Sequence, residues 1–319
     1  MVGRLLALVV AVAMVVGSLA LRSRIDKGNE VRRLTCSSEL AAVCNGIGHG
    51  VRITIEPAGT TADRLVGLSP GDDAGLDGWL VAGPWPAMVD AARQASARDP
   101  LFGGRSEPLA SSPLALVVES RRAGALAKAC TPLSWPCVAT AATKQWQDLG
   151  GPSFATFGAV KADIPDPASS AGGVAVLGAI SDGLFTGRDF ARDDDRLRSA
   201  LAGLRRVATQ PGPDAVTTVL TAAAVTDTVA TTEAEALGVL DQAANRNAVA
   251  VLYPSAVVVD VELGSVGTGG PTTNLAALVR GSAGRDALTT AHWKLGPPAA
   301  GTTTDSGVLA ALRAAWRGQ

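Results

Sequence analysis

The 319-residue sequence has few histidines, few aromatic residues and no excess of charge of either sign. Its two histidines, His49 and His292, lie far apart in the sequence, which excludes a histidine-rich metal site and leaves few candidates for a Ser-His-Asp triad. The 28 basic and 29 acidic side chains argue against a protein that binds nucleic acid through a strongly basic surface. A Walker phosphate-binding loop is also missing. We therefore expect no enzyme, no bound metal and no cofactor.

The N-terminus, in contrast, has the features of an export signal or a membrane anchor. Arg4 precedes an apolar stretch from Leu5 to Leu21, at the short end of the 17–25 residues that span a bilayer. Ser18-Leu19-Ala20 has the small-x-small pattern of a signal-peptide cleavage site, although the basic residues that follow work against translocation. We predict a signal peptide or membrane anchor over residues 1–21 and a linker over 22–33. The folded part then lies on the outer face of the cell membrane or is secreted.

Four cysteines agree with an oxidising compartment. They form two close pairs in sequence, Cys36 with Cys44 and Cys130 with Cys137. Zinc knuckles need two to four residues between ligands, and the gaps here are longer. Four cysteines allow three pairings, of which we favour the local one.

Apolar patterning predicts an α/β fold, because short buried strands alternate with helices at the spacing typical of parallel sheets. The strands are expected near residues 51–55, 78–82, 114–118, 159–164, 248–252 and 257–261. The helices are expected near 37–43, 88–98, 174–184, 188–206, 275–288 and 308–316. A long Ala/Thr-rich region over 214–244 is expected to form one or two further helices.

Small hydroxyl residues recur where a predicted strand gives way to a helix. The pairs are Ser37-Ser38, Ser111-Ser112 and Ser169-Ser170. Helix N-termini carry free N–H groups and the positive end of the dipole, so several of them around a cleft would form a polar or anion-binding site. Each serine could instead be an ordinary N-cap, and both interpretations stay open at this stage.

Several segments, taken in order, resemble extracellular solute-binding proteins of the type II periplasmic fold, the group that includes molybdate- and sulfate-binding components of ABC importers. The most specific is Asp163-Ile-Pro-Asp-Pro-Ala-Ser-Ser-Ala-Gly-Gly173, which is similar to a helix start of that family. The others are Leu34–Ser38, Asp77–Trp85, Leu109–Val118, Val249–Pro254 and Gly307–Trp316, the last being similar to a segment that joins such domains to von Willebrand factor A domains in actinobacterial proteins.

The resemblance implies a two-lobed α/β fold with two hinge crossings and a cleft that closes on a ligand. Lobe one would take residues 34–110 and 256–319, and lobe two residues 111–255. A small polar or anionic solute would be bound for an ABC permease or for sensing. The expected ligand-binding residues are Ser37, Ser38, Trp85, Ser111, Ser112, Ser169, Ser170, Gly172 and Tyr253.

Two other functions remain open. The same fold could serve as an extracellular interaction module with a protein partner, such as a von Willebrand factor A-domain protein. A secreted hydrolase is the third alternative, since paired carboxylates cannot be recognised by sequence spacing alone.

Overall fold

The computed structural model describes residues 32–47, 50–187, 189–207, 215–266, 271–296 and 304–318. The predicted signal peptide or anchor lies outside these ranges. Among the described residues, no helix is both long enough and apolar enough to cross a membrane.

A mixed sheet runs through the whole molecule in the order β2-β1-β3-β8-β4-β6-β5, and β7 and β9 also pair with β4. The strands are β1 (Arg32–Ser37), β2 (Val51–Glu56), β3 (Gly78–Ala82), β4 (Ser106–Glu119), β5 (Ala162–Asp163), β6 (Thr228–Thr232), β7 (Val249–Leu252), β8 (Val258–Ser265) and β9 (Lys294–Leu295). Among the strands of the described residues, β1 pairs parallel with β2 and β3, and β5 pairs parallel with β6. The expectation of parallel sheets is therefore met only in part, because the strands that cross between the lobes pair antiparallel to their neighbours.

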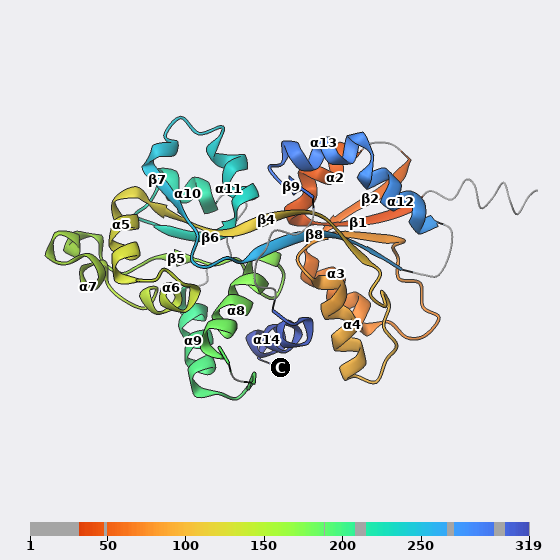
Figure 1. Ribbon diagram of the computed structural model, residues 1–319, viewed down its shortest axis with the longest axis horizontal. Helices are drawn as coiled ribbons and strands as arrows, with labels where there is room; N and C mark the ends of the chain where they lie inside the picture. The colour runs from red at the N-terminus through yellow and green to blue at the C-terminus, as the bar shows by residue number, and fades with distance from the viewer. Residues whose placement is uncertain are drawn as a thin grey trace, which may run out of the picture.

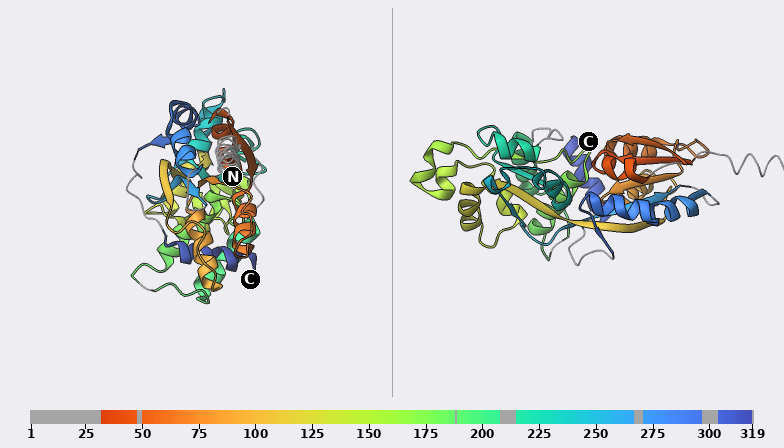
Figure 2. Two further views of the ribbon diagram at one scale, coloured as in Figure 1. Left: turned by 90° about the vertical axis from the view of Figure 1, so that its right-hand side faces the viewer. Right: turned by 90° about the horizontal axis from the view of Figure 1, so that it is seen from above.

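Two lobes share the long strand β4 (Figure 1). Its first half, Ser106–Pro113, pairs with β8, and its second half, Leu114–Glu119, pairs with β6 and β7. Seen from above in Figure 2, β4 runs from one lobe into the other. We call the lobe that contains β1 to β3 the first lobe and the lobe that contains β5 to β7 the second lobe. This arrangement confirms the predicted two-lobed α/β fold, while the residue boundaries given above remain a prediction.

Helices cover both faces of the sheet. In chain order they are the 3₁₀ turn η1 (Ser38–Leu40), α2 (Ala41–Ile47), α3 (Ala58–Gly67), α4 (Trp85–Ala95), α5 (Ser120–Ala129), α6 (Trp135–Ala141), α7 (Trp146–Gly150), η2 (Pro152–Phe157), α8 (Ala171–Leu184), α9 (Asp195–Val207), α10 (Ala215–Thr221), α11 (Glu233–Leu240), η3 (Arg246–Ala248), α12 (Pro271–Arg280), α13 (Ser282–Thr290) and α14 (Ser306–Arg317). In the first lobe, α2, α12 and α13 lie on one face and α3 and α4 on the other (Figure 1).

The few aromatic side chains are concentrated in the core. Trp79, Trp85, Trp135 and Trp146 are fully buried, together with Phe102. All five belong to one hydrophobic cluster, and each such ring removes a large apolar area from water, so a chain with only 4% aromatic residues still fills its core.

The predicted helical region over 214–244 contains two helices, α10 and α11, but the prediction is wrong in its middle. There Thr228–Thr232 forms the fully buried strand β6, which lies between β4 and β5. Helical propensity of the surrounding alanines is outweighed by β-branched residues that pack well in a sheet. The single helix expected over 275–288 is likewise two helices, α12 and α13, with Gly281 between them.

Both local disulfides are confirmed. Cys36 at the end of β1 bonds to Cys44 in α2, and Cys130 after α5 bonds to Cys137 in α6. The first pair ties the first strand of the fold to the helix that follows it, and both of its sulfurs are buried.

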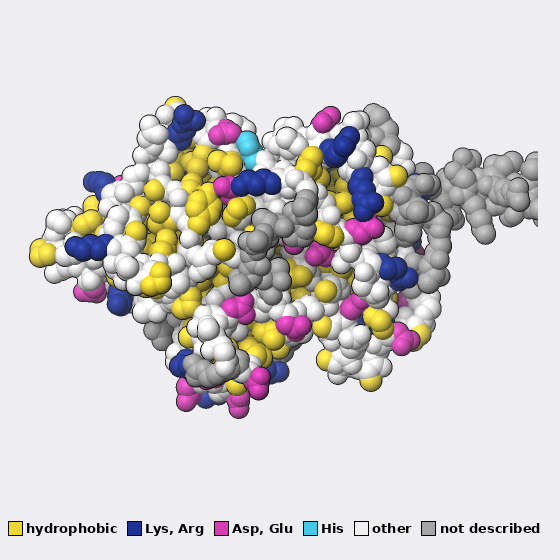
Figure 3. Space-filling view, viewed as in Figure 1, with side chains coloured by type: hydrophobic (Ala, Val, Ile, Leu, Met, Phe, Trp, Pro, Cys, Tyr) yellow, Lys and Arg dark blue, Asp and Glu magenta, His cyan; other side chains and the backbone are white. Residues whose placement is uncertain are grey.

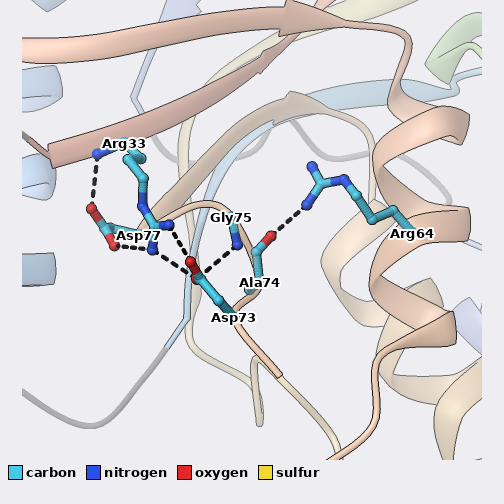
Figure 4. A network of polar contacts seen from close by, with 6 residues as sticks. All are labelled: Arg33, Arg64, Asp73, Ala74, Gly75 and Asp77. Carbon is cyan, nitrogen blue, oxygen red and sulfur yellow. Dashed lines mark hydrogen bonds and ion pairs between the residues drawn. The ribbon is translucent and has the colours of Figure 1, made fainter. Parts of the chain in front are cut away.

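A network of polar contacts fixes the loop before β3 (Figure 4). The backbone N–H of Arg33 in β1 donates to Asp77 at 2.8 Å, and its guanidinium contacts Asp73 at 2.6 Å and Asp77 at 3.1 Å. The guanidinium holds the pKa of Asp73 down at about 2. From α3, Arg64 donates to the carbonyl of Ala74. The loop is therefore held between β1 and α3, which keeps the start of β3 in register with its neighbours.

Candidate solute site between the lobes

The two lobes meet where parallel strands of the first lobe end and helices of the second lobe begin. Glu39, directly after β1, accepts a hydrogen bond at Oε1 from the backbone N–H of Ala171, the first residue of α8 (3.0 Å). A helix N-terminus has unpaired N–H groups and a partial positive charge, so it attracts a carboxylate. The place where the sequence predicts a bound anion is thus occupied by a side chain of the facing lobe.

Burial changes the pKa of Glu39. Loss of water around the carboxyl raises its pKa, and the nearby carboxylate of Glu235 raises it further. Hydrogen bonds from the Ala171 amide and the Ser37 hydroxyl oppose this shift. The second oxygen, Oε2, is buried and has no hydrogen-bond partner within the described part of the chain. No pattern in the sequence indicated this contact, which joins residues 132 positions apart.

Serines 169 and 170 lie at the start of α8 and make hydrogen bonds within their own turn. Ser170 is the N-cap: its Oγ accepts from the Gly173 N–H at 3.2 Å and donates to the Asp166 carbonyl at 2.9 Å. Ser169 donates to a carboxylate oxygen of Asp166 at 3.2 Å. Gly172 is buried in the first turn of the same helix. Solute binding by these residues stays a prediction, and their contacts here are those of capping residues.

The other predicted serines lie on the first lobe and on the crossing strand. Ser112 in β4 is buried and its Oγ accepts from the N–H of Ala234 in α11 at 2.9 Å. Ser37 is buried at the end of β1, and Ser111 is buried in β4. Ser38 is exposed at the start of η1. The structure therefore brings Ser37 and Glu39 to the junction with α8, and Ser112 to the start of α11.

The two aromatic residues expected to line the cleft differ from each other. Trp85 has no exposed surface and packs in the core of the first lobe, with the guanidinium of Arg313 5.2 Å from its ring centre. In this conformation it offers no surface to a solute. Tyr253 is 47% exposed, and its hydroxyl donates to Glu233 at 2.5 Å. Partial burial and the bond to Glu233 raise the pKa of Tyr253 to about 12, so the phenol stays neutral.

A groove of about 640 Å³ opens between the lobes beside Glu39. We call it the interlobe groove. Its walls are α2 and α13 of the first lobe and α11 of the second, and Figure 1 shows these helices facing each other above β4 and β8. Small residues line much of it, which leaves room between the helix backbones. Its lining residues are Glu39, Ala42, Gly46, Ala234, Glu235, Gly238, Asp241, Gln242, Ala283, Asp286, Ala287, Thr290, Ala291, His292 and Trp293.

On the opposite side of the sheet, α14 joins the two lobes. Figure 1 places it between α8 and α4, and it packs against both. Arg313 donates to the carbonyl of Gly59 (3.2 Å) and to Asp63 (2.9 Å) in the first lobe, and to the carbonyl of Ala168 (2.9 Å) in the second. Trp316 donates to Asp166 of the second lobe at 3.0 Å. We call this set of contacts the α14 clasp. No pattern in the sequence indicated it.

No protein-family model matches the sequence, and no curated protein matches it. Solved structures do resemble it. Iron-bound HitA from Pseudomonas aeruginosa is 12% identical with a TM-score of 0.60, over 90% of this chain and 99% of HitA. The periplasmic binding protein AfuA from Actinobacillus pleuropneumoniae, with fructose-6-phosphate bound, is 12% identical with a TM-score of 0.58, over 88% of this chain and 94% of AfuA.

The sulfate-binding protein SubI from Mycobacterium tuberculosis H37Rv is 13% identical with a TM-score of 0.52, over 83% of this chain and 86% of SubI. These similarities cover nearly the full length of each protein, including both lobes. The chain therefore has the two-lobed fold of periplasmic solute-binding proteins.

Proposed function

We propose that the protein is an exported solute-binding protein that holds a small polar solute between its two lobes and responds by opening or closing at β4 and β8. The interlobe groove carries this proposal. Because its walls come from both lobes, a solute inside it contacts both and stabilises one lobe arrangement over another. The two disulfides support export, since such bonds persist in oxidising compartments.

Delivery to an ABC permease is the use that the fold of the similar structures favours, and sensing is the other. The anionic solute expected from the serine pattern would have to compete with the carboxylate of Glu39 at the start of α8. We therefore place the solute in the groove beside Glu39 rather than on the α8 N-terminus itself.

A thermal-shift screen of the full chain tests the proposal. The panel contains oxyanions, sugars, amino acids, peptides and amines. A solute at 100 times its dissociation constant adds about 2.7 kcal/mol to stability, which moves the melting temperature of a chain of this size by a few degrees.

Two glycine variants test whether a solute that raises the melting temperature binds in the interlobe groove. Gly238 lies in α11 and lines the groove, and a Cβ built there meets no atom within 4 Å, so Gly238→Trp fills the groove without forcing the helix. Gly124 in α5 is equally open but lies outside the groove, so Gly124→Trp is the matched control. Loss of the shift in the first variant alone supports the proposal. An equal shift in both contradicts it.

The α14 clasp favours a second function, an extracellular interaction module with a protein partner. Arg313 donates to both lobes, so contacts within the chain join them directly. If no member of the panel shifts the melting temperature of well-folded protein, the interaction module becomes the better explanation of the fold.

A further inference from the structure

The interlobe groove is negatively charged. Glu39 comes from the turn after β1, Glu235 and Asp241 from α11 and the residue after it, and Asp286 from α13. Among the described residues that line the groove there is no lysine or arginine. His292 lies at the rim, with its Nε2 3.5 Å from a carboxylate oxygen of Asp241. Carboxylates thus face the groove from both lobes.

One of these carboxylates is incompletely bonded. Glu235 is satisfied at Oε2 by the hydroxyls of Thr231 (2.7 Å) and Thr232 (3.1 Å). Glu39 uses Oε1 for the Ala171 amide, whereas its buried Oε2 has no partner in the described ranges. A buried acceptor without a donor destabilises the fold, and more so when it is charged. A cation beside Oε2 would supply the missing partner.

Building on the proposed function, we propose that the interlobe groove binds a small organic cation, with an ammonium or guanidinium group pairing with the carboxylate of Glu39. A group of this kind offers several N–H donors and a positive charge, which suits a carboxylate with one free oxygen. The groove volume of about 640 Å³ accommodates a molecule rather than a single ion. Asp241 and Asp286 lie at other points of the wall and attract a second positive group.

Proton exchange provides a signature of this arrangement. The carboxyl of Glu39 faces Glu235, the Ser37 hydroxyl and the Ala171 amide, with Asp241, Asp286 and His292 elsewhere on the groove wall. Burial and Glu235 favour its protonated form. A bound cation favours the ionised form, so binding releases a proton from Glu39. Affinity for the cation therefore increases as the pH rises through the pKa of Glu39.

Calorimetric titration of the full chain with three molecules of similar length tests the inference. The probes are 1,4-diaminobutane, 1,4-butanediol and succinate, which carry positive, no and negative charge. We expect the diamine to bind and the other two to show no heat of binding. Repeating the diamine titration over a pH series, in buffers of different ionisation enthalpy, should reveal proton release and binding that becomes tighter as the pH rises.

Two substitutions separate the role of Glu39 from a general charge effect. Glu39→Gln removes the charge that faces the groove and should weaken diamine binding at least tenfold and abolish proton release. Glu107 is exposed on β4 outside the groove, so Glu107→Gln changes the net charge equally and should leave binding unchanged. Unchanged diamine affinity in Glu39→Gln overturns the inference.

The outcomes also separate this inference from the proposed function. Binding of succinate but not of the diamine overturns the cation class and leaves solute binding intact. The same conclusion follows if neither succinate nor the diamine binds, while another solute from the screen shifts the melting temperature of the unmodified protein but not that of Gly238→Trp. Failure of every solute to shift the melting temperature overturns both.

Discussion

Replacing Arg313 with alanine should open the two lobes. The Arg313 side chain is only 12% exposed and contacts the first lobe at Gly59 and Asp63 and the second at Ala168. When the lobes separate, the Arg313 guanidinium can keep its contacts to only one lobe. The closed arrangement is therefore favoured over the open one by at least the charged hydrogen bond to the other lobe, that to Ala168. Such a bond contributes about 1.5–3 kcal/mol, which corresponds to a roughly 10- to 150-fold change in the ratio of closed to open molecules.

The size of the population change follows from this ratio. For an open fraction on the order of 1%, Arg313→Ala should raise it to roughly 10–60%. Double electron–electron resonance would measure the open fraction from the distances between spin labels at Gln94 on α4 and Ser199 on α9. Both residues are exposed, and they lie on different lobes.

A neighbouring arginine provides the control. Arg317 lies one turn further along α14 and contacts Asp63 of the first lobe at 2.7 Å. An ion pair this exposed contributes about 0–1 kcal/mol, so Arg317→Ala should leave the label distance unchanged. If Arg313→Ala gives the same distance distribution as the unmodified protein, the α14 clasp does not hold the lobes together.

Three further outcomes are expected. Gly59→Ala places a Cβ 2.0 Å from a carbonyl oxygen of the facing lobe and should also separate the labels, whereas Gly67→Ala in the same helix meets nothing within 4 Å and should not. Replacing Cys36 and Cys44 with serine opens a short loop and should lower the free energy of unfolding by about 2–4 kcal/mol, measured by urea titration; equal midpoints for both proteins would contradict this. Burial raises the pKa of Glu262 from 4.5 to about 7, so this group stabilises the fold as the pH falls from about 7 towards 4.5, and Glu262→Gln should remove that part of the pH dependence of unfolding.

The order of elements was largely predictable from sequence because most strands carry a local pattern. The apolar runs at β3 and at the second half of β4 are buried on both faces, and such runs are recognisable in isolation. The first half of β4 was not predicted as a strand, since apolar and polar residues alternate too weakly from Ser106 to Ser112 to indicate one. Its strand form depends on pairing with β8, which is more than 140 residues away in sequence.

The candidate site was predictable only in its location. The serine pairs predicted a site at the end of β1 and at the start of α8, and the structure brings those two places together. They left open whether Ser170 is a cap or a ligand-binding residue, and they did not indicate that Glu39 would face α8. Hydroxyl and carboxyl groups satisfy whichever donor the fold brings within reach, so their partners depend on tertiary contacts rather than on neighbouring residues.

The shared strand β4 also affects how the molecule unfolds. Figure 3 shows the surface indented between the lobes, yet β4 continues through that waist without a loop. Fraying of either half of the strand removes hydrogen bonds from the end of the other half. Two lobes joined only by flexible linkers can melt independently, but lobes that share one strand lose their sheets together. The protein should therefore behave as one cooperative unit, and destabilisation of one lobe should reach the other through the same strand.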